Sequence, residues 1–233
     1  MNQLVRRVTP VALMALGLLA APTAFAVTNV ISVADFTGPN GNVGYNTKSY
    51  SFGTVSSLNG YNFSKKTIAG VQNLGASPGI PGEFSLTQGT DQGMLVTYLT
   101  PQNVQSIALG FLYPKEVFSD THNEAVNITF NGTTTYTLTA TGTTSFVWTG
   151  GGAVTNLSPA KGGGAGQWQI TNPFAGSVTS ILLSPFDTGA GRNFTNSDFG
   201  VNSIVSAVPE PITLLLLGSG MAFVMFRKRL RDC

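Results

Sequence analysis

The chain has 233 residues, of which only 9% are charged, and its formal net charge is +2. Half of its twelve basic residues lie in the two chain ends, so the body between them carries six basic against eight acidic residues. A weakly acidic body excludes nucleic-acid binding, which needs clustered cations to neutralise phosphates. The single cysteine, Cys233, is the last residue, so the body has no internal disulfide.

The first 26 residues have the three parts of a cleavable secretory signal. Arg6 and Arg7 form the charged region, residues 11–21 form an apolar run, and Ala24 and Ala26 place small side chains at the cleavage positions. The apolar run is short for a helix that spans a bilayer. We therefore expect a signal helix that the export translocase engages and that signal peptidase removes after Ala26.

Residues 27–206 are predicted to form one all-β domain. Alternation of apolar and polar residues recurs, with turn-forming residues between the alternating runs. The clearest unit is Ala125–Ala140, where Asn131-Gly132 separates two such runs and favours a hairpin with a type I′ turn. We expect an antiparallel sandwich of two sheets, jelly-roll-like in topology. The other predicted strands are 30–36, 49–54, 66–73, 83–87, 94–99, 105–113, 145–149, 167–171, 178–183 and 199–206.

The body offers little that indicates catalysis. His122 is its only histidine, and with Asp120 and Glu124 it forms either a polar cluster or a solvated loop between strands. The acidic residues show no pairing of the kind that glycoside hydrolysis needs. We therefore expect no enzymatic activity, no catalytic residues and no cofactor.

Two weaker features suggest binding. Calcium would suit loop carboxylates, although the chain lacks the EF-hand pattern; the candidate ligands are Asp35, Asp187 and Asp198. Trp148 and Trp168 lie beside glycine-rich stretches and are candidate platforms for sugar rings. Packing in the core is the alternative for both, because Trp148 alternates with Phe146.

The chain closes with three parts in residues 207–231. The first, Val208-Pro209-Glu210-Pro211, cannot continue a strand or a helix interior. The second, residues 212–226, is apolar and about 22 Å long as a helix, so it is a predicted transmembrane segment. The third is a basic cluster that favours the cytoplasmic side and leaves the body outside. Its members are Arg227, Lys228, Arg229 and Arg231.

This arrangement resembles the PEP-CTERM sorting signal of Gram-negative bacteria. The resemblance implies that exosortase, a membrane-embedded cysteine protease or transpeptidase, recognises Val208, Pro209, Glu210 and Pro211 and processes the chain near them. It also implies transient anchoring in the inner membrane and a producing organism that makes exopolysaccharide, biofilm or floc. The alternative is a plain single-pass anchor, which gives no reason for the Pro-Glu-Pro sequence.

The sequence therefore predicts an exported protein of the cell surface or extracellular matrix, structural or adhesive, in contact with exopolysaccharide. The first alternative is a carbohydrate-binding module that uses Trp148 and Trp168. The second is a hydrolase of matrix polysaccharide, for which no carboxylate pair can be named.

Overall fold

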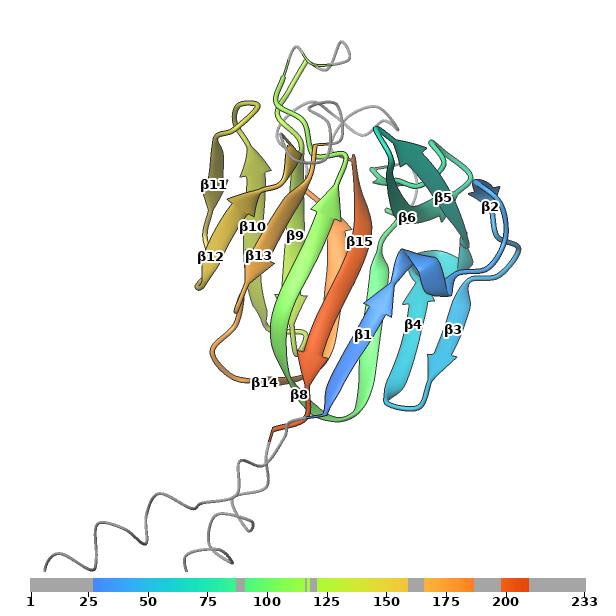
Figure 1. Cartoon of the computed structure of the whole chain (residues 1–233), viewed down its shortest axis with the longest axis vertical. Helices are drawn as coiled ribbons and strands as arrows, with labels where there is room; N and C mark the ends of the chain where they lie inside the picture. The colour runs from blue at the N-terminus through green and yellow to red at the C-terminus, as the bar shows by residue number, and fades with distance from the viewer. Residues whose placement is uncertain are drawn as a thin grey trace, which may run out of the picture. The chain divides into compact units, whose positions relative to one another are not determined.

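The computed structural model describes residues 27–86, 91–115, 117, 121–158, 166–186 and 198–209 (Figure 1). Residues 27–209 form one compact unit. The predicted signal helix 1–26, the predicted transmembrane helix 212–226 and the basic cluster 227–231 lie outside the described residues. Within the described part of the chain, no helix has the length and apolarity needed to span a bilayer.

The body is built almost entirely of strands. They are β1 (Thr28–Ser32), β2 (Gly41–Asn42), β3 (Thr47–Tyr50), β4 (Gly53–Ser57), β5 (Asn62–Ile68), β6 (Val71–Ser77), β7 (Phe84–Ser85), β8 (Met94–Gly110), β9 (Ala125–Phe130), β10 (Thr134–Ala140), β11 (Phe146–Trp148), β12 (Ala153–Asn156), β13 (Trp168–Thr171), β14 (Ser177–Pro185) and β15 (Asp198–Ala207). Two short 3-10 helices, η1 (Val33–Asp35) and η2 (Leu58–Gly60), complete the described elements. The predicted all-β class is confirmed.

The long strand β8 organises the sheet because its two halves have different neighbours. Residues 94–98 pair with β4 and β14, whereas residues 103–110 pair with β15 and, over part of that length, with β13. Every recorded pairing is antiparallel. β8 thereby joins fifteen strands into one hydrogen-bonded network. The finer prediction of a jelly-roll-like sandwich of two sheets stays a prediction.

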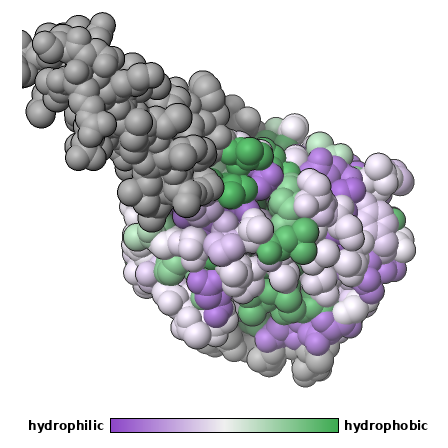
Figure 2. Space-filling view, turned by 90° about the horizontal axis from the view of Figure 1, so that it is seen from below, coloured by the Kyte–Doolittle hydropathy of each residue, from purple (hydrophilic) through white to green (hydrophobic). Residues whose placement is uncertain are grey.

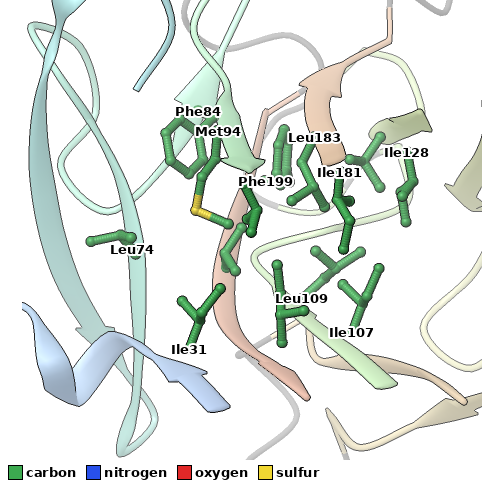
Figure 3. Close-up of a cluster of buried hydrophobic side chains, with 14 of the residues drawn as sticks. Ile31, Leu74, Phe84, Met94, Ile107, Leu109, Ile128, Ile181, Leu183 and Phe199 are labelled. Atoms are coloured by element: carbon green, nitrogen blue, oxygen red, sulfur yellow. The ribbon is translucent and has the colours of Figure 1, made fainter. Parts of the chain in front are cut away.

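Two layers of strands are visible in Figure 1, with the apolar core between them. One layer runs β11-β10-β9-β14-β8-β4-β3, and the other contains β12, β13, the second half of β8, β15 and β1. Figure 3 shows side chains from both layers pointing toward one another, among them Ile107, Ile128 and Ile181. These residues are fully buried and belong to one continuous cluster. Alternate positions of each strand therefore supply the core, as the sequence periodicity indicated.

Pro101 lies inside β8, although the sequence predicted two separate strands on either side of it. A β-bulge explains this, because Thr179 of β14 alone stands opposite residues 98–101 of β8. Proline has no N–H to donate to a ladder, and the bulge is a place where none is required. The bulge lets one strand change partners and cross from one layer to the other.

Two turns with the same backbone geometry were not equally predictable. The Asn131-Gly132 turn between β9 and β10 is confirmed, with φ of 53° and 69° at its two residues. The Ala69-Gly70 turn between β5 and β6 has φ of 50° and 77°, yet the sequence predicted one continuous strand there, over 66–73. Alanine rarely adopts positive φ because its Cβ approaches the following carbonyl oxygen. In the same way, the predicted strand 49–54 is a hairpin of β3 and β4.

The strain at Ala69 gives a testable prediction. Ala69→Asn should raise the free energy of unfolding by about 1 kcal/mol, because asparagine tolerates the left-handed region at lower cost. Ala69 is exposed, so the new side chain meets solvent. Chemical denaturation of the variant and the parent measures the difference. Ala153→Asn, also exposed but in strand β12, is the matched control and should bring no gain; equal stabilisation by both changes would contradict the turn geometry.

Candidate functional site

The last strand of the body, β15, is paired along both edges. On one side it pairs with β8 from Gly200↔Gly110 to Ala207↔Asn103. On the other side its second half pairs with β1, from Ser203↔Ser32 to Ala207↔Thr28. Ala207 is only 4% exposed. The pairing continues to the residue immediately before the predicted Val208–Pro211 motif, so no linker separates that motif from the sheet.

The two ends of the body meet at this point. The Val208 N–H donates a hydrogen bond to the Val27 carbonyl at 3.2 Å. Val27 is the first residue after the predicted signal cleavage site, whose Ala24 and Ala26 lie outside the described residues. Val208 and Pro209 are half-buried, while Glu210 and Pro211 lie outside the description. The predicted signal cleavage site precedes Val27, and the predicted sorting motif begins at Val208. The two predicted processing sites are therefore adjacent to one hydrogen-bonded pair of residues, Val27 and Val208.

This arrangement restricts where a protease can bind. Proteases bind peptides in extended form, largely through the main-chain hydrogen-bonding groups that a sheet uses. Up to Ala207 these groups lie in a strand that is paired on both sides. In the folded body the Val208 N–H is still bonded to the Val27 carbonyl, so Pro209 is the first described residue of the motif beyond the paired backbone.

Comparison with protein families decides the nature of this segment, because the model of the PEP-CTERM protein-sorting motif matches residues 207–229. The chain carries a PEP-CTERM protein-sorting motif. The motif supports sorting to the cell surface by exosortase through a membrane-anchored export intermediate. The match includes Arg227, Lys228 and Arg229 and stops before Arg231. Neither the curated proteins nor the solved structures gave a match to the chain.

Trp168 corrects one prediction. It was a candidate sugar platform, but it is 1% exposed and its Nε1 donates to the Leu112 carbonyl at 3.1 Å. Phe146 packs edge-on against its ring, with centroids 5.6 Å apart. A sugar would need one free ring face, and Trp168 offers none. The core alternative therefore holds for this tryptophan.

Trp148 is only partly buried and packs at the margin of the core. Its Nε1 donates to the Gly151 carbonyl at 2.8 Å, and its ring meets Tyr136 edge-on at 5.7 Å. A Cβ at Gly150 would clash with both rings. The glycine-rich stretch that follows Trp148 therefore packs closely around the indole.

The predicted cluster around His122 is not assembled by the described residues. His122 Nδ1 lies 2.9 Å from the hydroxyl of Thr121, the preceding residue. Glu124 is buried and accepts a hydrogen bond from the Tyr113 backbone N–H. Asp120 lies outside the described residues. Glu124 therefore has a structural role in holding the chain segment before β9.

The described residues do not bring the predicted calcium ligands together as a group of three. Asp35 accepts hydrogen bonds from the Ser32 N–H at 2.8 Å and from the Tyr50 hydroxyl at 3.1 Å. Asp198 is buried at the start of β15, and Asp187 lies outside the description. Over the part of the chain that is described, no three His, Cys, Asp or Glu side chains gather as metal ligands would.

A buried polar contact that sequence reasoning missed joins β6 to Gln167, the residue before β13, and lies against β8 and β15. Asn73 is fully buried, and its Oδ1 accepts from Gln167 Nε2 at 3.2 Å. Gly110 and Gly200 make room for it, since a Cβ at either position would clash with the Asn73 side chain. The only sequence signals are glycines inside otherwise apolar strands. The contact fixes the register of the strand that leads to the PEP-CTERM motif.

The pairing of β1 with β15 gives a testable prediction, because neighbouring residues of β1 differ in burial. Ile31→Ala removes a side chain that is buried opposite Ile204 and should cost about 2–5 kcal/mol. Val30→Ala, at a position 47% exposed, should cost under about 1 kcal/mol. Hydrogen exchange of the amides in residues 203–207 should accelerate only in the Ile31 variant. Equal protection in both variants would show that β1 does not hold β15.

Proposed function

We propose that the chain is an exported structural or adhesive protein whose body is delivered to the cell surface or extracellular matrix by exosortase. The signal is removed after Ala26, and residues 212–226 hold the intermediate in the inner membrane. Exosortase then recognises Val208–Pro211 and releases the body, a jelly-roll-like sandwich, toward exopolysaccharide. The body has no catalytic activity and needs no cofactor.

The observation that carries this proposal is the position of the sorting motif relative to the sheet. The match begins at Ala207, the residue that ends β15. Upstream of Val208 the backbone is fixed by pairing on both edges. Downstream, Pro209 and Pro211 prevent the strand from continuing. The recognised residues therefore lie at the first point where the chain leaves the sheet.

Features of the body support a structural rather than an enzymatic role. Its buried charged groups are used internally: Lys65 Nζ donates to the Phe36 carbonyl at 2.6 Å, and Lys66 pairs with Glu83 at 2.7 Å. Its surface is largely neutral, with hydroxyl and amide side chains. Such a surface suits many weak contacts with neutral polymer better than the activation of a nucleophile.

The proposal is tested by the intact mass of the mature protein from two strains that differ only in exosortase. With exosortase, the recovered body should begin at Val27, keep Ala207 and lack residues 212–231. Without it, the chain should stay in the membrane fraction with Cys233 retained. Processing that is independent of exosortase, or a cut upstream of Ala207, would contradict the proposal.

Two variants sharpen this experiment. The double change Pro209→Ala/Pro211→Ala should leave the chain unprocessed in the exosortase strain, because the stiff break is lost. Cys233→Ser is the matched control, since it changes the tail outside the matched residues 207–229. Normal processing of both variants would show that the prolines are not recognised.

Carbohydrate binding is a second candidate function, favoured by the exposed apolar residues of β11, the strand at the end of the sheet order. Phe146 and Val147 are 38% and 52% exposed, beside the partly buried Trp148. If these residues bind sugar, exopolysaccharide should change the Trp148 fluorescence saturably, and Trp148→Phe should abolish the change. A signal that survives in Trp148→Phe, or no saturable signal in the parent, would reject this candidate.

A further inference from the structure

One end of the body gathers the points where the described chain starts and stops. The tether end comprises residues 27–30, 50–53, 99–103, 131–133, 172–178 and 207–209. Backbone hydrogen bonds connect these segments: the Val208 N–H donates to the Val27 carbonyl, and the Leu99 N–H donates to the Phe52 carbonyl at 2.9 Å. Asn103 pairs with both Ala207 and Ser177. Asn131 Nδ2 donates to the Ser177 carbonyl at 3.3 Å, which brings in the β9–β10 turn.

The tether end contains no charged side chain, because none of its segments includes Asp, Glu, Lys, Arg or His. Removal of the signal after Ala26 would leave one charge there, the α-amino group of Val27. Asp198 and Glu124 lie at the opposite ends of β15 and β9. The charges that reach the tether end are those near Tyr50: its hydroxyl donates to Asp35, and Lys48 Nζ lies 5.7 Å from the centre of its ring. Burial raises the pKa of Tyr98, and burial with the nearby Asp35 carboxylate raises the pKa of Tyr50 far above its ordinary value. These two tyrosines therefore add no charge at physiological pH.

The tether end also presents apolar side chains to its surroundings. Leu99 is 75% exposed at the bend of β8, and Val27 is 64% exposed beside Val208. Figure 2 views the molecule from below and shows green, apolar patches among pale and strongly purple, hydrophilic surface. Leu99 and Val27 are the two most exposed large apolar residues in the described part of the chain. Single exposed apolar residues are ordinary, but here the two most exposed ones both belong to the end that has no charged side chain.

Chain length fixes how far this end can stand from the membrane. Only Glu210 and Pro211 separate Pro209 from Ile212, the first residue of the apolar segment. Three residue steps reach at most about 10 Å. The headgroup layer of one leaflet is about 5–8 Å thick. In the anchored intermediate, Pro209 therefore lies within about 10 Å of the start of the apolar segment, a distance similar to the thickness of that layer.

We propose that the tether end lies against the lipid headgroups of the membrane that holds residues 212–226, with Leu99 inserted among them. This inference rests on the proposed function, because it takes those residues as the anchor. Charged side chains at this end would lose hydration on contact with the headgroup–hydrocarbon boundary, whereas amides and hydroxyls lose less and an exposed leucine gains. The α-amino group of Val27 would lie at the level of the lipid phosphates, which can pair with it. The contact keeps the tether end facing the membrane and holds Val208–Pro211 at the membrane surface, where a membrane-embedded protease can bind it.

The sequence provides a clean test, because Cys233 is the only cysteine. The full-length chain, made in cells without exosortase and carrying Cys233→Ser, is given a single cysteine by Leu99→Cys and labelled with an environment-sensitive fluorophore. Thr121→Cys on the same background is the control, since Thr121 is exposed and precedes β9 at the opposite end. Each protein is reconstituted into neutral phosphatidylcholine vesicles that contain lipids spin-labelled near the headgroup.

The fluorophore at position 99 should be quenched severalfold more strongly than the one at position 121, and its emission should shift to the blue. Detergent without spin-labelled lipid should remove the quenching difference. If the chain floats with the vesicles but both positions are equally solvent-exposed, the docking inference is wrong and the proposed anchoring stands. If the chain does not associate with vesicles at all, the anchor itself fails, and the proposed function fails with it.

Discussion

The backbone pairing of β15 with β8 and β1 is the constraint on which the rest of the molecule depends. β8 provides one edge, and β1, the first strand of the described body, provides the other. The strand that leads to the sorting motif is therefore held between β8 and the residues that follow the predicted signal. Both ends of the described body lie together, and a pull on the chain beyond Val208 would act on a strand paired along both edges rather than on an edge strand.

The register of that strand depends on tight packing around it. Asn73 occupies space left by Gly110 and Gly200, so a shift of one residue would place a side chain against it. A shift would also turn the inward face of β15 toward solvent. Because Ile204 is buried opposite Ile31, the same shift would break the contact with β1. The point where the motif leaves the sheet is thus fixed by residues far from the motif.

The sequence was informative where a local signal has one physical meaning. Asn131-Gly132 predicted a turn because both residues accept positive φ, and the sorting motif was visible because prolines, an apolar run and cations stand in order. Prediction from the sequence failed where tertiary packing, rather than local preference, determines the conformation or burial of a residue. Ala69 accepts a turn that its own preference opposes, and Pro101 lies within a strand because a bulge removes the need for its N–H. Trp168 resembled a surface aromatic until the structure buried it beneath Phe146.

The distribution of charge along the strands follows from the same geometry. A chain with 9% charged residues has few groups to place, and none of its charged side chains belongs to the segments of the tether end. Solubility requires only that they be exposed somewhere, so composition alone does not explain their position. The proposed anchoring gives a reason, because the short connection from Pro209 to residues 212–226 would hold that corner closest to a medium where charge is costly. Under this proposal, the lack of charged side chains at that corner and the missing linker serve one requirement, that the body reach the protease while still attached to its anchor.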